Sequence, residues 1–148
     1  MKNFLQFNMN DIKIFSAIKY YFYSFFTLIF STSFWKIPLV LFQAPVLMHI
    51  GSKKFYVNKL MDIWVLKEVV LDKQYDVYGR AKKDWIVVDI GSGIGEFAIM
   101  MSKKVKKIIA LDMSEDRMLI ARKNIEMHNV KNVILERKEV KDLNSVFK

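Results

Sequence analysis

A buried-strand pattern followed by closely spaced glycines lies past the middle of the chain and constrains its fold more than any other feature. Residues Ile86 to Ile90 form an almost unbroken apolar run, which predicts a strand covered on both faces and hence central in a parallel sheet. Gly91, Gly93 and Gly95 follow at a spacing of two, so a ligand can lie against bare backbone in a sharp turn. We expect a side chain introduced at Gly93 to occupy the space of that ligand.

A helix and a second strand that ends on an acid complete this pattern. The helix is predicted from Glu96 to about Lys104, and its free N–H groups would point at a ligand in the turn. The strand from Ile108 to Leu111 ends on Asp112, where an acid can accept hydrogen bonds from ribose hydroxyls. We expect Asp112→Ala to weaken cofactor binding without unfolding the domain. The whole stretch predicts half of a nucleotide-cofactor site.

Two details distinguish between cofactors. The third glycine comes one residue earlier than in the fingerprint of dinucleotide-binding proteins, so an NAD-binding half-domain is the weakest interpretation. Asp89, just before the turn, would repel a pyrophosphate but could pair with a cationic amino-acid group. The pattern therefore favours S-adenosylmethionine.

The residues of this stretch resemble a known superfamily. The segment D-I-G-S-G-I-G-E-F resembles motif I of the class I S-adenosylmethionine-dependent methyltransferases, and the segment from A-L-D-M-S-E-D-R to L-E-R-K-E-V is similar to the FkbM family within it. The resemblance covers roughly residues 51–143 and implies a Rossmann-like α/β fold, S-adenosylmethionine as cofactor, and O-methyl transfer to a small-molecule or glycan acceptor. Motif and residue types together assign cofactor contacts to Asp89, Gly91, Ser92, Gly93, Gly95, Glu96, Phe97, Asp112, Met113 and Glu139.

Some of these assignments have ordinary structural alternatives. Glu139 follows a third predicted strand, Val133 to Leu135, and would lie near the adenine or be a solvated carboxylate. Glu68 and Tyr75 precede motif I in a segment similar to the FkbM family, which would place them at the mouth of the site. A solvated helix carboxylate and a packed loop aromatic are slightly favoured for these two residues.

The superfamily has a seven-stranded sheet, whereas only three core strands are expected here before Lys148. We therefore expect the N-terminal half of the fold, an open apolar sheet edge prone to self-association, and no turnover by the chain alone. No catalytic residue is identified. The leading hypothesis is a methyltransferase or its cofactor-binding half, and the alternative is a noncatalytic membrane-surface or interaction module with a methyltransferase-like half-fold.

Local signals predict the elements on either side of the central stretch. Apolar runs around a turn predict a hairpin over Val46 to Val57, and Asn58 is the expected N-cap of a helix that continues to about Leu71. Ser114 is the expected N-cap of the helix after Asp112, and Asn129 is expected to end it in a left-handed conformation. The buried stripe of that helix is predicted to be Met118, Ala121 and Ile125.

Residues 1–50 form an apolar, aromatic-rich segment that is predicted to be helical and to precede a partial cofactor domain at 51–148. Lys19 and Lys36 bound an uncharged aromatic run that is shorter than the roughly 20 residues of a membrane-spanning helix, and Pro38 and Pro45 interrupt the apolar residues beyond it. Three interpretations stay open: a helix packed on the domain, an interfacial helix on a membrane surface, and a transmembrane segment.

The composition bears on the expected binding partners and on the cellular compartment of the protein. The net charge of +9 suits an anionic partner, but no arginine-rich or aromatic-interleaved basic run supports nucleic acid, which is the less favoured choice. The chain has no cysteine, and His49 and His128 lack ligand spacing, so no metal site is expected. We expect a cytoplasmic protein, and association with a membrane is left open as an alternative.

Overall fold

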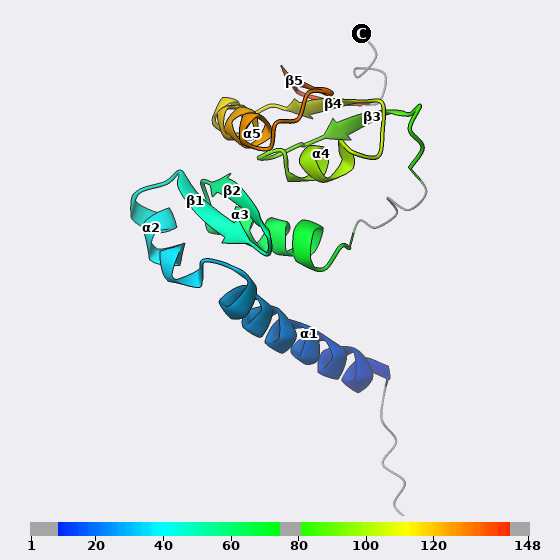
Figure 1. Ribbon diagram of the computed structural model, residues 1–148. Helices are drawn as coiled ribbons and strands as arrows, with labels where there is room; N and C mark the ends of the chain where they lie inside the picture. Colours follow the sequence, from blue (N-terminus) through cyan, green and yellow to red (C-terminus); the bar gives the residue numbers. More distant parts are fainter. Residues whose placement is uncertain (1–8, 75–80, 143–148) are drawn as a thin grey trace, which may run out of the picture.

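A computed structural model describes residues 9–74 and 81–142, with the side chains of the first helix described from Ile14 onward (Figure 1). The elements in chain order are α1 (Met9–Ser31), the 3-10 helix η1 (Phe34–Lys36), α2 (Ile37–Phe42), β1 (Val46–Ile50), β2 (Lys53–Val57), α3 (Leu60–Leu66), the π-helix η2 (Lys67–Leu71), β3 (Ile86–Ile90), α4 (Glu96–Met101), β4 (Lys107–Asp112), α5 (Glu115–Met127) and β5 (Val133–Arg137).

Strands β3, β4 and β5 form a parallel sheet in that order, and helices α4 and α5 make the crossovers between them. In the register, Asp89 lies opposite Ala110 and Asp112 lies opposite Arg137, so the carboxyl ends of the strands share one edge. Alternating parallel strands and helices are the repeating unit of doubly wound folds. The predicted α/β Rossmann-like architecture is therefore confirmed for this part of the fold.

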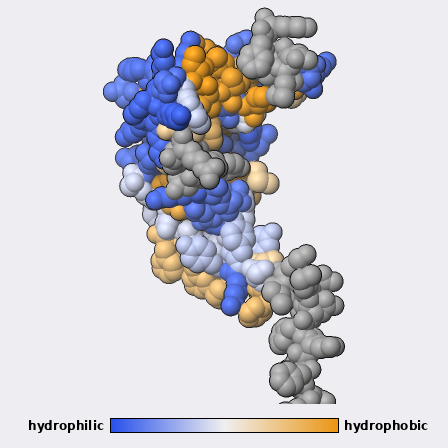
Figure 2. Space-filling view, turned by 90° about the vertical axis from the view of Figure 1, so that its right-hand side faces the viewer, coloured by the Kyte–Doolittle hydropathy of each residue, from blue (hydrophilic) through white to orange (hydrophobic). Residues whose placement is uncertain are grey.

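Strand β3 stands at the edge of the three-stranded sheet, so the prediction of a central place for Ile86 to Ile90 is wrong for the described residues. Ile86 is 59% exposed and Ile90 is 47% exposed, and Figure 2 shows a strongly hydrophobic patch at the end of the molecule where the sheet lies. A continuous apolar run shows that a strand is suited to burial on both faces. The strand becomes central only if a further strand pairs with its free edge. The predicted open apolar edge is confirmed among the described residues.

The predicted hairpin is confirmed: β1 and β2 pair antiparallel, with Met48 opposite Phe55. These two buried side chains belong to a core cluster that also takes Leu66 from α3, Ile99 from α4 and Ile120 from α5. The hairpin and the parallel sheet therefore share one core. A second cluster, which includes Ala98, Met101, Val105, Ile108 and Ala110, lies between α4 and the sheet.

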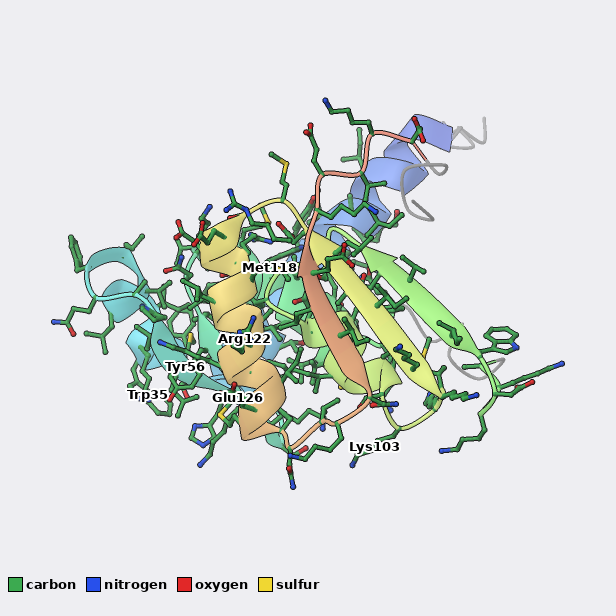
Figure 3. All side chains as sticks on the ribbon, turned by 90° about the horizontal axis from the view of Figure 1, so that it is seen from above. Trp35, Tyr56, Lys103, Met118, Arg122 and Glu126 are labelled. Atoms are coloured by element: carbon green, nitrogen blue, oxygen red, sulfur yellow. The ribbon has the colours of Figure 1, made fainter. Side chains whose placement is uncertain are left out.

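Asn124 of α5 joins the hairpin to the glycine turn. Its side chain is fully buried; Oδ1 accepts a hydrogen bond from the backbone N–H of Tyr56 at 2.7 Å, and Nδ2 donates to the carbonyls of Tyr56 and Ile94, both at 3.0 Å. Tyr56 lies beside α5 on the side away from the sheet (Figure 3). One amide thus satisfies buried backbone groups in two segments that are far apart in sequence.

Local capping signals are confirmed in part. Ser114 caps α5 by accepting from the N–H of Arg117, Asn129 has a φ of 55°, and the predicted stripe of α5 is buried. Asn58 is not the N-cap of α3, because that position belongs to Lys59. Asp62 in the first turn accepts instead from the N–H groups of Asn58 and Lys59, both at 2.9 Å. A carboxylate reaching back from the first turn has replaced the predicted asparagine cap.

The aromatic-rich segment forms the predicted helix α1, which extends from the rest of the molecule beneath α3 (Figure 1). Its residues Ile14–Ser31 are long and apolar enough to cross a membrane by length and composition, and 6% of that stretch is buried inside the protein. The C-terminal end of α1 meets the hairpin through a bridge between Thr32 and Ile50.

Candidate cofactor-binding site

The turn between β3 and α4 is fixed to the end of the neighbouring strand. The N–H groups of Gly91 and Ser92 both donate to the carbonyl of Leu111, at 2.8 and 2.9 Å, and the N–H of Gly95 donates to the carbonyl of Ser92 at 2.9 Å. Gly91 and Gly93 adopt φ values of 75° and 57°, which L-residues with a side chain rarely take. The predicted use of glycine in this turn therefore agrees with its backbone.

Asp112 fastens the turn to the start of α5. Its carboxylate is 8% exposed; Oδ2 accepts from the N–H of Gly93 at 3.0 Å and Oδ1 accepts from the N–H of Ser114 at 2.8 Å. Each carboxylate oxygen can accept a further hydrogen bond, so a ribose hydroxyl can still bind here. Asp112 has a structural function in addition to the predicted contact with a cofactor.

A cavity of about 280 Å³ opens beside the turn at the carboxyl ends of the strands. It brings together four of the predicted site residues, Gly91, Asp112, Met113 and Glu139. A Cβ atom on Gly91 would meet no other atom within 4 Å. The remaining lining residues are Ile90, Leu111, Lys138 and Val140. The space beside Gly91 is therefore open to a ligand of moderate size.

Three polar side-chain atoms around the turn are buried without a hydrogen-bond partner: Asp89 Oδ2, Ser92 Oγ and Glu96 Oε2. A buried polar atom without a partner costs about 1 to 3 kcal/mol, so such atoms mark a place where a polar ligand group would be stabilised. Two of the three belong to carboxylates, which favour a cation. The cationic ammonium of the methionine part of S-adenosylmethionine fits this requirement.

Burial shifts the pKa values of both carboxylates. The pKa of Asp89 rises to about 6, first because the group is buried and second because Asp112 is also negative. The pKa of Glu96 rises to about 7, chiefly through burial. The charges of Asp89 and Asp62 raise it further, while a backbone hydrogen bond and Arg117 lower it. A cationic ligand would reverse these shifts by favouring both charged forms.

The shifts predict that the ligand-free protein loses stability as the pH rises. Because the folded-state pKa of Glu96 lies above its ordinary value of 4.5, its contribution is fully present below that pH and is lost as the pH passes about 7. Glu96→Gln stays neutral, so we expect it to match the parent at pH 5 and to unfold at a higher temperature than the parent at pH 8. Thermal unfolding at both values measures this difference.

Glu126→Gln provides the control for this experiment, since Glu126 is an exposed carboxylate on α5. It should follow the parent at both pH values. A Glu96→Gln variant that unfolds with the same pH dependence as the parent would show that Glu96 does not titrate in this range.

A partly buried ion pair that the sequence did not indicate lies beside the turn. Arg117 Nη2 is 2.8 Å from Asp62 Oδ1, and Asp62 is 2% exposed. A Cβ on Gly93 would stand 3.0 Å from Arg117 Nη1 and 3.4 Å from Glu96 Oε1. The space beside Gly93 is thus occupied by protein side chains, so the predicted overlap with a ligand applies better to Gly91.

The predicted residues that do not line the cavity include five in or beside the turn: Asp89, Ser92, Gly93, Gly95 and Glu96. Phe97 and Glu68 also lie away from its lining. Phe97 of α4 is partly buried and packs against the second core cluster. Glu68 accepts a hydrogen bond from Trp64 Nε1 at 2.8 Å and one from the hydroxyl of Tyr20 at 3.4 Å, so it contacts α1. Tyr75 lies outside the described residues. Lys138 and Val140 also line the cavity, and the sequence analysis did not identify them as site residues. Their position on either side of Glu139 could have indicated them.

Comparison with known proteins gives one family and one curated relative. Residues 81–148 match the model of a family described as a methyltransferase domain. The chain is 40% identical over 99 residues to a probable cobalt-precorrin-6B C(15)-methyltransferase (decarboxylating) of Methanococcus vannielii, a match that covers 67% of this chain and 53% of the relative. The chain thus spans about half the length of that relative.

Solved structures also resemble part of the chain. A putative methyltransferase from Streptococcus mutans in complex with SAH is 28% identical, with a TM-score of 0.43 over 46% of this chain and 39% of the other. A precorrin 8w decarboxylase of Methanobacterium thermoautotrophicum is 20% identical, with a TM-score of 0.43 over 47% of this chain and 38% of the other.

Proposed function

We propose that this protein is a class I S-adenosylmethionine-dependent methyltransferase that transfers a methyl group to a small-molecule or glycan acceptor. The match of residues 81–148 to a methyltransferase domain and the similarity to a probable methyltransferase support this proposal. The cofactor follows from the family. The acceptor is part of the proposal, because the chain spans only about half of its curated relative.

The observation that carries this proposal is the arrangement of groups around the glycine turn. Buried, unpartnered atoms of Asp89 and Glu96 offer negative charge around the turn. Beside the turn, Asp112 lines an open cavity together with Gly91. A ligand with a cationic amino acid at one end and a ribose in the middle would use both sets of contacts. S-Adenosylmethionine has these two parts.

The bound cofactor would supply an electrophilic methyl group on its sulfonium. Residues of this chain would hold it: Asp89 and Glu96 by charge, Asp112 by hydrogen bonds to the ribose, and Met113 and Glu139 at the adenine end of the cavity. Methyl transfer in line with the sulfonium needs little acid or base assistance once the acceptor is positioned, so the expected contribution of these residues is orientation.

Two observations bear on the accepting atom. The FkbM-like segments favour oxygen, as in an O-methyltransferase. The name of the curated relative describes methylation at C(15), which is a carbon atom. We infer an oxygen acceptor from the segments that resemble the FkbM family, and the assay below includes carbon acceptors of the corrinoid class to test that choice.

Titration calorimetry with S-adenosylhomocysteine is the direct test. We expect saturable binding to the full chain and no binding of NAD, because the turn lacks the glycine spacing of dinucleotide sites. Transfer of labelled methyl groups to sugar, lipid, RNA and corrinoid acceptors then identifies the acceptor class. Absence of S-adenosylhomocysteine binding to the folded chain would refute the proposed function, and binding of NAD would indicate a different cofactor.

A further inference from the structure

Helix α1 exposes an unusually broad apolar surface. At about 100° per residue, its exposed aromatic and aliphatic side chains cover an arc of about 200° on the side opposite Ser24, wider than the stripe of roughly 100° by which a helix usually packs on a core. Phe15 is 59% exposed, Phe22 66% and Phe30 81%. The other exposed members are Ile14, Ile18, Tyr21, Tyr23, Phe25 and Phe26. The lower body of the molecule in Figure 2 shows pale orange, hydrophobic surface beside surface of intermediate hydropathy.

The narrow opposite side of α1 is fastened to the domain by buried polar contacts. Ser24 and Lys67 of η2 are both fully buried, and Lys67 Nζ donates to Ser24 Oγ at 2.5 Å. The same ammonium pairs with Asp72 Oδ2 at 2.5 Å and lies 4.3 Å from the centre of the Tyr20 ring. Releasing α1 would take Ser24 and Tyr20 away from the buried ammonium of Lys67, and a buried charge that loses its partners is costly.

A groove lies where α1 meets α3. It has a volume of about 400 Å³ and is lined by Tyr21, Leu60, Met61 and Trp64. Met61 is 63% exposed and Tyr21 is 62% exposed, although both are large and largely apolar. The exposed apolar surface therefore extends from the helix onto α3 and includes this groove.

The apolar surface continues past the end of α1. Trp35 of η1 is 74% exposed and Phe42 at the end of α2 is 83% exposed. Tryptophan is enriched at the boundary between lipid and water, where its ring lies among the head groups. Monomeric soluble proteins rarely expose a contiguous apolar surface of this kind, which marks an interaction site.

The charges beside this surface are basic. Within residues 9–74 lysines outnumber acids, and the acids are Asp11, Asp62, Glu68 and Asp72. The last three have partners inside the protein: Arg117, Trp64 and Lys67 respectively. In contrast, Lys19, Lys59 and Lys73 are exposed, and Lys19 Nζ lies 4.6 Å from the centre of the Phe15 ring. An aromatic surface with Lys19 beside it, in a segment where lysines outnumber acids, complements anionic lipid.

We propose that α1, together with Trp35 and Phe42, docks on the surface of an anionic lipid bilayer and lies in the plane of its head groups. The helix is long enough to span a bilayer, but it is held near its middle by Ser24 and Lys67, and a spanning helix would carry that buried polar contact into hydrocarbon. This inference goes beyond the proposed methyl transfer and does not depend on it.

Sedimentation of the full chain with vesicles tests the proposal. We expect binding to vesicles of equimolar phosphatidylcholine and phosphatidylglycerol, much weaker binding to phosphatidylcholine alone, and release by alkaline carbonate. The double variant Phe22→Gln/Phe30→Gln should bind at least about tenfold more weakly, since it removes two large apolar side chains from the lipid contact. The matched control Leu119→Gln/Met127→Gln changes exposed apolar residues on α5 and should bind like the parent.

Circular dichroism and thermal unfolding establish that both double variants fold. No binding of the folded parent to anionic vesicles would overturn the proposal, as would equal loss of binding in the control variant. A parent that is dimeric in solution, fails to bind vesicles and becomes monomeric in the Phe22→Gln/Phe30→Gln variant would assign the surface to a second copy. Retention in the membrane after carbonate treatment would refute the in-plane orientation.

Discussion

Gly91→Val is expected to abolish binding of S-adenosylhomocysteine, a loss of at least about 100-fold, while the domain still folds. The new side chain would enter open space on the wall of the cavity, because no atom lies within 4 Å of a Cβ at this position. The φ of 75° makes any L-residue there strained by roughly 1 to 2 kcal/mol, which lowers the unfolding temperature only moderately. Titration calorimetry and thermal unfolding of the same sample measure both effects.

Two further glycine variants separate occupation of the cavity from backbone strain. Gly91→Ala carries the same strain with a smaller side chain, so it should retain more affinity than Gly91→Val. Gly93→Val should lose more stability than either, because its side chain must displace Arg117 and Glu96. If Gly91→Val binds as tightly as the parent, the cavity beside the glycine turn is not the cofactor site.

Asp112→Ala is expected to lower both the affinity for S-adenosylhomocysteine and the free energy of unfolding. The variant leaves the N–H groups of Gly93 and Ser114 without their acceptor, at about 1 to 3 kcal/mol for each buried donor. The loss of affinity should be of similar size, about 1 to 3 kcal/mol, if the carboxylate also accepts from the ribose. The sequence-based expectation was a loss of affinity in a domain that stays folded, and the two hydrogen bonds add an expected loss of stability to it.

Ser114→Ala is the matched control for Asp112. It removes the cap of α5, which typically costs about 1 kcal/mol, but Ser114 does not line the cavity. We expect it to lose stability and to keep its affinity for S-adenosylhomocysteine. Should Asp112→Ala behave in the same way, the acid is structural only and the predicted ribose contact is wrong.

The sequence predicted those parts of the site that depend on neighbouring residues. A turn with positive φ requires glycine, a helix start requires a side-chain acceptor such as Ser114, and a left-handed helix end favours Asn129, so each of these can be recognised locally. Asp112 could be recognised as well, because a parallel strand that ends beside the turn must bring its last side chain to the same edge.

Contacts between distant segments could not be predicted in this way. Asp62 and Arg117 meet across 55 positions of sequence, and their pairing fills the space beside Gly93 that the sequence left open to a ligand. Whether β3 lies at the edge or in the middle of the sheet depends on which strands pair with it. The apolar pattern of β3 does not indicate how many strands pair with it. Likewise, nothing near Lys67 in the sequence indicates that its ammonium is buried against Ser24.

The buried amide of Asn124 is one link in a series of hydrogen bonds that connects the glycine turn to α1. Through it the glycine turn is joined to β2, β2 pairs with β1, and β1 is tied to the end of α1 where the N–H of Ser33 donates to the carbonyl of His49. With α1 resting on a bilayer, the mouth of the cavity would therefore stand at a constant height and tilt above the lipid, and that height would select acceptors by how far they project from the membrane.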